Sequence, residues 1–219
     1  DADIESAANG IIAGNFGASG QSCVAGSRVI VQKNISSKLK DIIKQKSENI
    51  IVGNPLDPKT NLGPLCTSKQ IEIIENTINK SVSQGAEIIF GGKKIEKEGN
   101  YFEPTLIYCP HRDIETLKIE MFGPVISLIE FDSEEDAIDL ANDSEYGLGS
   151  GIFTKDLSRA HRVSKEIKAG ICWINTYRVI SPIAAFGGFN QSGYAREADK
   201  QSILDYTRTK TTWINTSDE

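Results

Sequence analysis

The sequence predicts an α/β fold with a largely parallel sheet, on two observations. Segments whose apolar residues recur at three- and four-residue steps, as on one face of a helix, alternate along the chain with short apolar runs. Those runs are almost continuous in Val, Ile and Leu, which is typical of strands that are buried on both faces of a parallel sheet. At 219 residues the chain is long enough to bury a sizeable core.

Most of the expected helices follow a polar capping residue. Asp3 caps the first, which ends in a run of spaced glycines, and Asn34 or Ser36 caps a second that reaches about Ser47. Four more helices are expected at 68–84, 133–143, 156–167 and 198–204.

The expected strands are rich in β-branched residues and are bounded by turn-forming residues. They lie at 27–32, 86–92, 101–108, 124–132, 149–154 and 169–175. After Asn175 the periodicity stops, and residues 176–197 form a long loop of the kind that is usually functional. A terminal strand at 205–215 alternates Thr with charged residues, and we expect it to pair with another chain or another domain.

Composition restricts the possible partners and the compartment. The net charge of −6 and the scattered lysines argue against nucleic acid. No run approaches the ~20 apolar residues of a membrane span and no signal peptide is recognisable, so we expect a cytoplasmic protein without a membrane partner. The chain starts without Met inside a helical pattern, which suggests a domain taken from a longer polypeptide.

The cysteines are far apart and form no Cys-x-x-Cys pair, which favours reduced thiols and argues against a metal site. They are Cys23, Cys66, Cys109 and Cys172. Cys23 stands out because it lies in "GASGQSCVAG", where small residues let a substrate approach and backbone N–H groups could hold an oxyanion. The alternative is that Cys23 only fills a gap beneath a turn. A Cys–His hydrolase has little support, since both histidines, His111 and His161, lie in surface-type segments.

Two further segments carry candidate binding residues. In "KIEMFGPVISLIEF", Glu120 and Phe122 flank a Gly-Pro turn before a strand, and in "AAFGGFNQSGYARE" glycines could allow a ligand to approach the backbone. The ordinary interpretations are a surface carboxylate beside a core Phe, and glycines that serve only as turns.

Taken together, "FGASGQSCVAGSRVIV", "GNPLDPKTNLGPL", "EMFGPVISLIEF", "YGLGSGIFTKDLSRA", "AGICWIN" and "FGGFNQSGYARE" resemble the aldehyde dehydrogenase superfamily in order and spacing. The resemblance implies the C-terminal, cysteine-bearing portion of such an enzyme. Its catalytic domain, at 1–190, would be three-layered with a largely parallel sheet. A C-terminal helix and oligomerisation strand would occupy 191–219, with the cofactor-binding domain absent from this chain.

The resemblance makes Cys23 the nucleophile. Its thiolate would attack an aldehyde to give a thiohemiacetal, whose oxyanion is held partly by the Cys23 backbone N–H. Hydride would pass to NAD or NADP, and water would hydrolyse the resulting thioester to the acid. The same resemblance implies that Glu120 binds the nicotinamide ribose and that Phe122 packs beside it. It places Phe186 in the aldehyde pocket, with Ser22, Val24 and the 177–183 loop tuning the choice of aldehyde.

Family members are about twice this length, so the isolated chain is expected not to turn over, and the parent enzyme is expected to be a homo-oligomer. Two alternatives stay open. One is an acylating dehydrogenase that transfers the thioester to coenzyme A. The other is a non-catalytic structural or oligomerising remnant, which thiol reactivity would distinguish from both enzymes.

Overall fold

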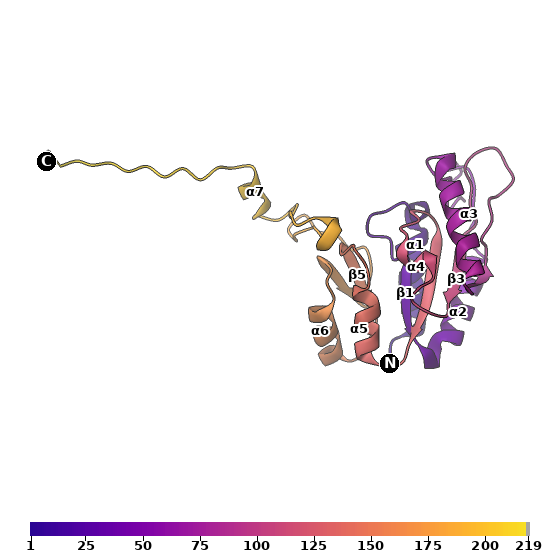
Figure 1. The fold of residues 1–219 in the computed structure, drawn as a ribbon. Helices are drawn as coiled ribbons and strands as arrows, with labels where there is room; N and C mark the ends of the chain where they lie inside the picture. Colours follow the sequence, from indigo (N-terminus) through magenta and orange to yellow (C-terminus); the bar gives the residue numbers. More distant parts are fainter. Residues whose placement is uncertain (218–219) are drawn as a thin grey trace.

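A computed structural model describes residues 1–217, and Figure 1 shows its α/β architecture. The last two residues of the 191–219 segment lie outside this range. The helices are α1 (Ile4–Phe16), α2 (Lys33–Ser47), α3 (Ser68–Ser83), α4 (Glu115–Lys118), α5 (Glu134–Asn142), α6 (Leu157–Glu166) and α7 (Ser202–Asp205). The strands are β1 (Arg28–Gln32), β2 (Glu87–Phe90), β3 (Thr105–Cys109), β4 (Val125–Phe131), β5 (Gly149–Ile152) and β6 (Ile171–Ile174).

The strands form two sheets. The larger has the order β1-β4-β3-β2, and the smaller consists of β5 and β6. The pairs β1–β4, β3–β4 and β5–β6 are parallel, and β2 joins β3 antiparallel. The predicted largely parallel α/β fold is therefore confirmed, although the sequence did not predict that the strands would divide between two sheets.

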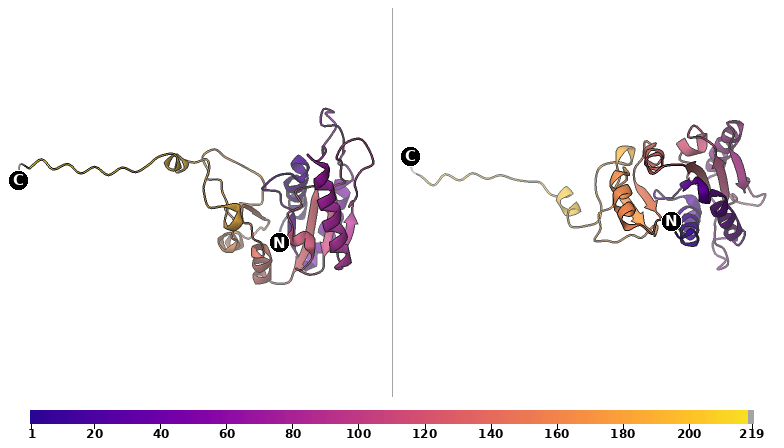
Figure 2. Two further views of the ribbon diagram at one scale, coloured as in Figure 1. Left: turned by 45° about the horizontal axis from the view of Figure 1, so that its top comes forward. Right: turned by 90° about the horizontal axis from the view of Figure 1, so that it is seen from below.

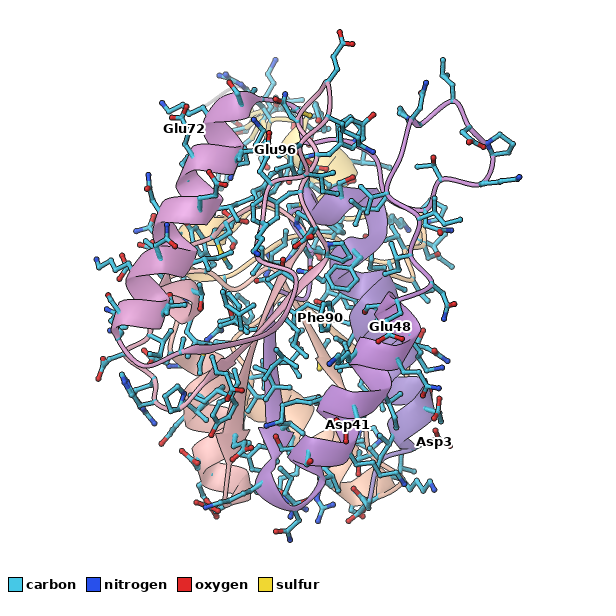
Figure 3. All side chains as sticks on the ribbon, turned by 90° about the vertical axis from the view of Figure 1, so that its right-hand side faces the viewer. Asp3, Asp41, Glu48, Glu72, Phe90 and Glu96 are labelled. Carbon is cyan, nitrogen blue, oxygen red and sulfur yellow. The ribbon has the colours of Figure 1, made fainter. Side chains whose placement is uncertain are left out.

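The larger sheet is the middle of three layers. Side chains of β4 alternate between its faces: Ile126 and Leu128 join a core with α1 and α2, while Val125 and Ile129 join a core with α3. All four are buried, and this period of two follows from the pleat of a strand. Figure 3 shows the outer surface of this part, where Asp41 of α2 and Glu72 of α3 are exposed.

Local chemistry explains where most helices begin. The side chains of Asp3, Thr67, Ser133 and Asp156 each accept a hydrogen bond from a backbone N–H in the first turn of the following helix. The prediction of Asn34 or Ser36 as a cap is wrong, because α2 begins directly after β1 with Gln32 at the cap position. The four-residue helix α4 was not predicted, since one turn is too short to show an apolar period.

One arginine ties the larger sheet to the end of helix α5. The Arg28 guanidinium, on β1, donates to the carbonyl oxygens of Leu140 (3.0 Å), Ala141 (2.9 Å) and Asp143 (3.1 Å) at the end of α5. These carbonyls have no partner within the helix, so a cation here both bonds them and suits the negative end of the helix dipole. Figure 1 shows α5 and α6 beside the small sheet, with the larger sheet to their right.

The C-terminal segment differs from the expectation. The helix expected at 198–204 is shorter and later, at Ser202–Asp205, and the strand expected at 205–215 does not form within the described chain. Its backbone groups find no strand edge to bond, and in both views of Figure 2 this segment runs away from the rest of the molecule. Pairing with another chain or domain stays a prediction. Among residues 1–217, no helix has the length and apolarity needed to cross a membrane.

Candidate active site

A strained turn leads from α1 to Cys23. Ala18, Ser19 and Gly20 follow one another in the left-handed region, with φ of 55°, 57° and 71°. Only glycine adopts this conformation freely, so the other two must be held in place. The Ser19 hydroxyl donates to the carbonyl oxygen of Gly63 (3.0 Å) and is one restraint on this turn.

Cys23 lies at the corner of the next turn. The Ala25 N–H donates to the Ser22 carbonyl oxygen (2.9 Å), which places Cys23 second in a four-residue β-turn and leaves its thiol exposed. The Gln21 side-chain oxygen accepts from the Cys66 N–H (3.0 Å) and ties the loop to a second segment. The Cys23 N–H donates no hydrogen bond within residues 1–217.

Cys23 borders a cavity of about 710 Å³ that runs between β1 and β5. Glu120, Gly26 and Tyr177 also line it, together with residues of both strands. The Glu120 carboxylate is exposed and forms no ion pair or hydrogen bond with the described residues. The structure therefore brings the predicted nucleophile and one predicted cofactor residue to the same cavity.

The turn that carries Glu120 is fixed by its neighbours. The Gln70 side-chain amide donates to the Met121 carbonyl oxygen, and Met121 itself is buried. Phe122 takes a positive φ of 46° and keeps 40% of its surface exposed, which is unusual for a phenylalanine. An exposed carboxylate and an exposed aromatic ring thus lie on one turn, which the Gln70 bond and the buried Met121 hold against α3.

The remaining predicted site residues lie near the cavity's boundary or beyond it. Ser22, Val24, Phe122 and Phe186 are not among the residues that line it. Val24 is buried and packs toward Gly149 of β5. Phe186 is partly buried in the long loop, where it pairs with Glu197 through two backbone hydrogen bonds of 2.8 and 2.7 Å.

Tyr177 is a site residue that the sequence indicated only as part of a loop. Its ring lies in a slot between three glycines, where a Cβ on Gly14, Gly26 or Gly151 would come within 2.8, 3.3 or 2.6 Å of it. The ring of Trp173 packs on it with centroids 4.8 Å apart. Burial raises the pKa of the Tyr177 hydroxyl to about 12. The glycines at 14, 26 and 151 were the only sequence signal for the position of Tyr177. Because they lie in three separate segments, the sequence alone does not show that one ring fills the space between them.

The other cysteines differ in environment. Burial raises the pKa of the Cys109 thiol to about 11, and burial also raises the pKa of Cys172. Cys66 is exposed, like Cys23, and lies on the other side of the Gln21 hydrogen bond. In the described part of the chain all four are free, and no three His, Cys, Asp or Glu side chains gather as metal ligands would.

Fold and site together define a three-layer α/β domain that presents an exposed cysteine at a cavity. The chain belongs to the aldehyde dehydrogenase family, whose profile matches residues 1–212. This confirms the resemblance drawn from the sequence motifs.

The chain is similar to characterised members of the family. It is 46% identical over its whole length to (Z)-2-((N-methylformamido)methylene)-5-hydroxybutyrolactone dehydrogenase of Acinetobacter baylyi, and 41% identical over 99% of its length to betaine aldehyde dehydrogenase of Agrobacterium fabrum. It covers 45% and 44% of these two relatives, and so spans less than half of their length.

Solved structures agree with the fold. An NAD+ complex of aldehyde dehydrogenase from Bacillus cereus superposes with a TM-score of 0.95 at 36% identity, over 99% of this chain and 44% of that one. An NAD+ complex of betaine aldehyde dehydrogenase from Staphylococcus aureus gives a TM-score of 0.90 at 34% identity, over 100% of this chain and 46% of that one.

Proposed function

We propose that this chain is the catalytic portion of an NAD(P)-dependent aldehyde dehydrogenase and that Cys23 is its nucleophile. The observation that carries the proposal is the exposed Cys23 thiol on a restrained turn at the cavity that Glu120 also lines. Accessibility and fixed geometry are what a nucleophilic thiol requires.

The reaction at Cys23 begins with attack of the thiolate sulfur on the aldehyde carbon. A C–S bond forms, the carbonyl π bond breaks, and the negative charge goes to the oxygen. The Cys23 N–H, which has no other acceptor within the described residues, is available to bond that oxygen. Loss of hydride from the same carbon restores the carbonyl as a thioester, and hydrolysis releases the acid and the free thiol.

Glu120 and Phe122 suit the nicotinamide end of a dinucleotide. A free carboxylate can accept from both hydroxyls of a ribose, and an exposed ring offers a flat apolar contact. NAD or NADP, when bound, would supply the hydride acceptor that the oxidation needs. We therefore assign Glu120 to the ribose and Phe122 to the adjoining ring, and Phe186, Ser22 and Val24 to the boundary of the aldehyde pocket.

A cofactor-binding domain and further copies of the chain would complete the enzyme, with residues 1–190 as the catalytic domain and 191–219 as its docking segment. Large apolar side chains exposed along the last part of the chain support this. Within the described part of 191–219 they are Tyr194, Ile203, Leu204, Tyr206, Trp213 and Ile214. Free cysteines in the described residues suit a reducing compartment, for which we propose the cytoplasm.

Alkylation of the chain by iodoacetamide at pH 7.5, followed by peptide mass spectrometry, tests the assignment. We expect Cys23 to react about tenfold faster than Cys66, which is also exposed and serves as the internal reference. The Cys23→Ser variant identifies the modified peptide. Equal rates at Cys23 and Cys66 would contradict an activated thiol in this chain and would favour a structural remnant.

A second measurement addresses the reaction itself. The enzyme that carries this chain together with a cofactor-binding domain should reduce NAD(P) on addition of an aldehyde, and Cys23→Ser should abolish that activity. A requirement for coenzyme A in this assay would replace hydrolysis by acyl transfer and would overturn the hydrolytic step.

A further inference from the structure

We propose that Arg178 binds the carboxylate of an aldehyde substrate, so that the enzyme prefers aldehydes with an anionic group at the far end. This inference rests on the proposed function, because it names the substrate class of the Cys23 site. Three observations on Arg178 and its surroundings support it.

The first observation is the position of the guanidinium. Arg178 follows Tyr177 on the loop after β6, with a positive φ of 64°. Its Nη1 donates to the carbonyl oxygen of Ala13 (3.3 Å), in the last turn of α1. That turn leads directly into the loop of Cys23. Arg178 itself does not line the cavity at the thiol, but the adjacent Tyr177 does, so the guanidinium lies at the cavity's boundary.

The second observation concerns the space that the guanidinium fills. A Cβ on Gly17 would overlap Nη1 of Arg178. Gly17 has φ of −56° and ψ of 137°, a conformation open to any residue, so its backbone does not require glycine. The missing side chain instead leaves room for the arginine head beside the start of the Cys23 loop.

The third observation is that the charge is uncompensated. Arg178 is partly buried, yet no carboxylate among residues 1–217 lies within ion-pair distance of it, and its one hydrogen bond is long. Other partly buried arginines are better satisfied: Arg28 has three backbone acceptors, and Arg159 pairs with Asp1 and Glu134.

A guanidinium with unused donors matches a carboxylate, which it can bind through two parallel hydrogen bonds. A hydrophobic or neutral aldehyde would leave those donors without a partner once water is excluded. The chemistry of Arg178 thus favours an ω-carboxylate aldehyde over a neutral aldehyde of the same length.

Paired alkylating agents measure the charge near Cys23 in this chain without cofactor. Iodoacetate and iodoacetamide are close in shape but differ by one negative charge. The iodoacetate rate divided by the iodoacetamide rate at Cys23, normalised to the same quotient at Cys66, therefore reports the local electrostatic field. We expect Arg178→Gln to lower this normalised ratio roughly threefold to tenfold, and Arg178→Lys to restore most of it. Arg112→Gln, which removes the same charge from a distant surface pair with Asp136, should leave it unchanged.

Either of two results would overturn the proposal. One is a normalised ratio that is the same in the wild-type chain and Arg178→Gln. The other is an equal loss in Arg178→Gln and Arg178→Lys, which would assign Arg178 a purely structural contact with Ala13. Raising the salt concentration on the wild-type chain provides a measurement that needs no variant: the ratio should fall as the charge is screened, and a ratio insensitive to salt argues against the proposal.

Substrate kinetics complete the test in the enzyme that includes the cofactor-binding domain. Succinic semialdehyde and butanal have the same carbon skeleton and differ by the carboxylate. We expect Arg178→Gln to lower the ratio of their kcat/KM values by roughly tenfold to a hundredfold, mainly through the KM for the semialdehyde. An unchanged ratio rejects the role of Arg178 and leaves the dehydrogenase intact, whereas an enzyme that reduces NAD(P) with no aldehyde rejects the proposed function itself.

Discussion

Gly20 lies directly against the peptide group between Gly123 and Pro124. A Cβ on Gly20 would overlap the Gly123 carbonyl and would lie 2.7 Å from the Pro124 nitrogen. This contact joins the loop that carries Cys23 to the turn that carries Glu120 and Phe122. The relative position of the proposed nucleophile and the proposed ribose ligand is therefore set by backbone packed on backbone.

Gly20→Ala is expected to lower the free energy of unfolding by more than about 2 kcal/mol. The φ of 71° alone costs an alanine about 1–2 kcal/mol, and the overlap with Gly123 adds to it. Urea denaturation measures the change. Gly63→Ala is the matched control, because a Cβ there meets nothing closer than 3.8 Å, and an equal loss in both variants would contradict the role of the Gly20–Gly123 contact.

Replacing Arg28 by Met should weaken the connection between β1 and the end of α5. Three carbonyl oxygens at the end of α5 would lose a charged donor, and we expect a loss of about 2–3 kcal/mol. Arg112→Met, which breaks an exposed pair with Asp136, should change stability by less than about 1 kcal/mol. Thermal and urea unfolding compare the two, and similar losses would show that the Arg28 bonds contribute no more than a surface ion pair.

Two substitutions of Tyr177 separate its ring from its hydroxyl. The hydroxyl has no hydrogen-bond partner in the described residues, so Tyr177→Phe should leave stability within about 0.5 kcal/mol. Tyr177→Ala empties the slot between Gly14, Gly26 and Gly151 and should cost about 3 kcal/mol. Calorimetry on both variants tests this, and a large loss in Tyr177→Phe would reveal a hydrogen bond that this structure lacks.

Stability should fall at alkaline pH partly because of Cys109. Its pKa is about 11 in the folded chain against an ordinary 9.0, so between these values the unfolded state releases the proton and the folded state retains it. Deprotonation thus favours unfolding, with no effect below about pH 8 and a loss near 1 kcal/mol at pH 10. Urea unfolding at pH 7.5 and pH 10 should show a smaller decrease for Cys109→Ala than for the wild type. Equal decreases would mean that Cys109 titrates normally.

The sequence predicted the parts of this molecule that depend on local chemistry. The caps at Asp3 and Ser133 and the apolar period of α3 depend only on neighbouring residues. The bounds predicted for these helices therefore differ from the observed ones by only a few residues. Family motifs then indicated Cys23 and Glu120 as parts of one site, and these two residues line one cavity.

What the sequence did not predict depends on distant contacts. The division into two sheets depends on pairings such as Arg28 with Ser127, nearly a hundred positions apart, and the bonds of Arg28 to α5 span more than a hundred. The slot between three glycines that the Tyr177 ring occupies is also formed by contacts between distant segments. The strand expected at 205–215 has the residue pattern of a strand, but a strand needs a neighbour to pair with, and this segment pairs with no strand of the described chain.

The separation of β5 from β1 leaves every second peptide group of β1 without a neighbour. Ser127 N–H donates to the Ser27 carbonyl, so the peptide groups of Val29 and Val31 face β4 and those of Arg28, Ile30 and Gln32 face the cavity. Protection against deuterium should therefore alternate residue by residue along this single strand. In the strand that follows the candidate nucleophile, peptide groups bonded to β4 alternate with unpaired ones that face the cavity. Fast amide exchange at the unpaired groups would show directly that water enters the cavity.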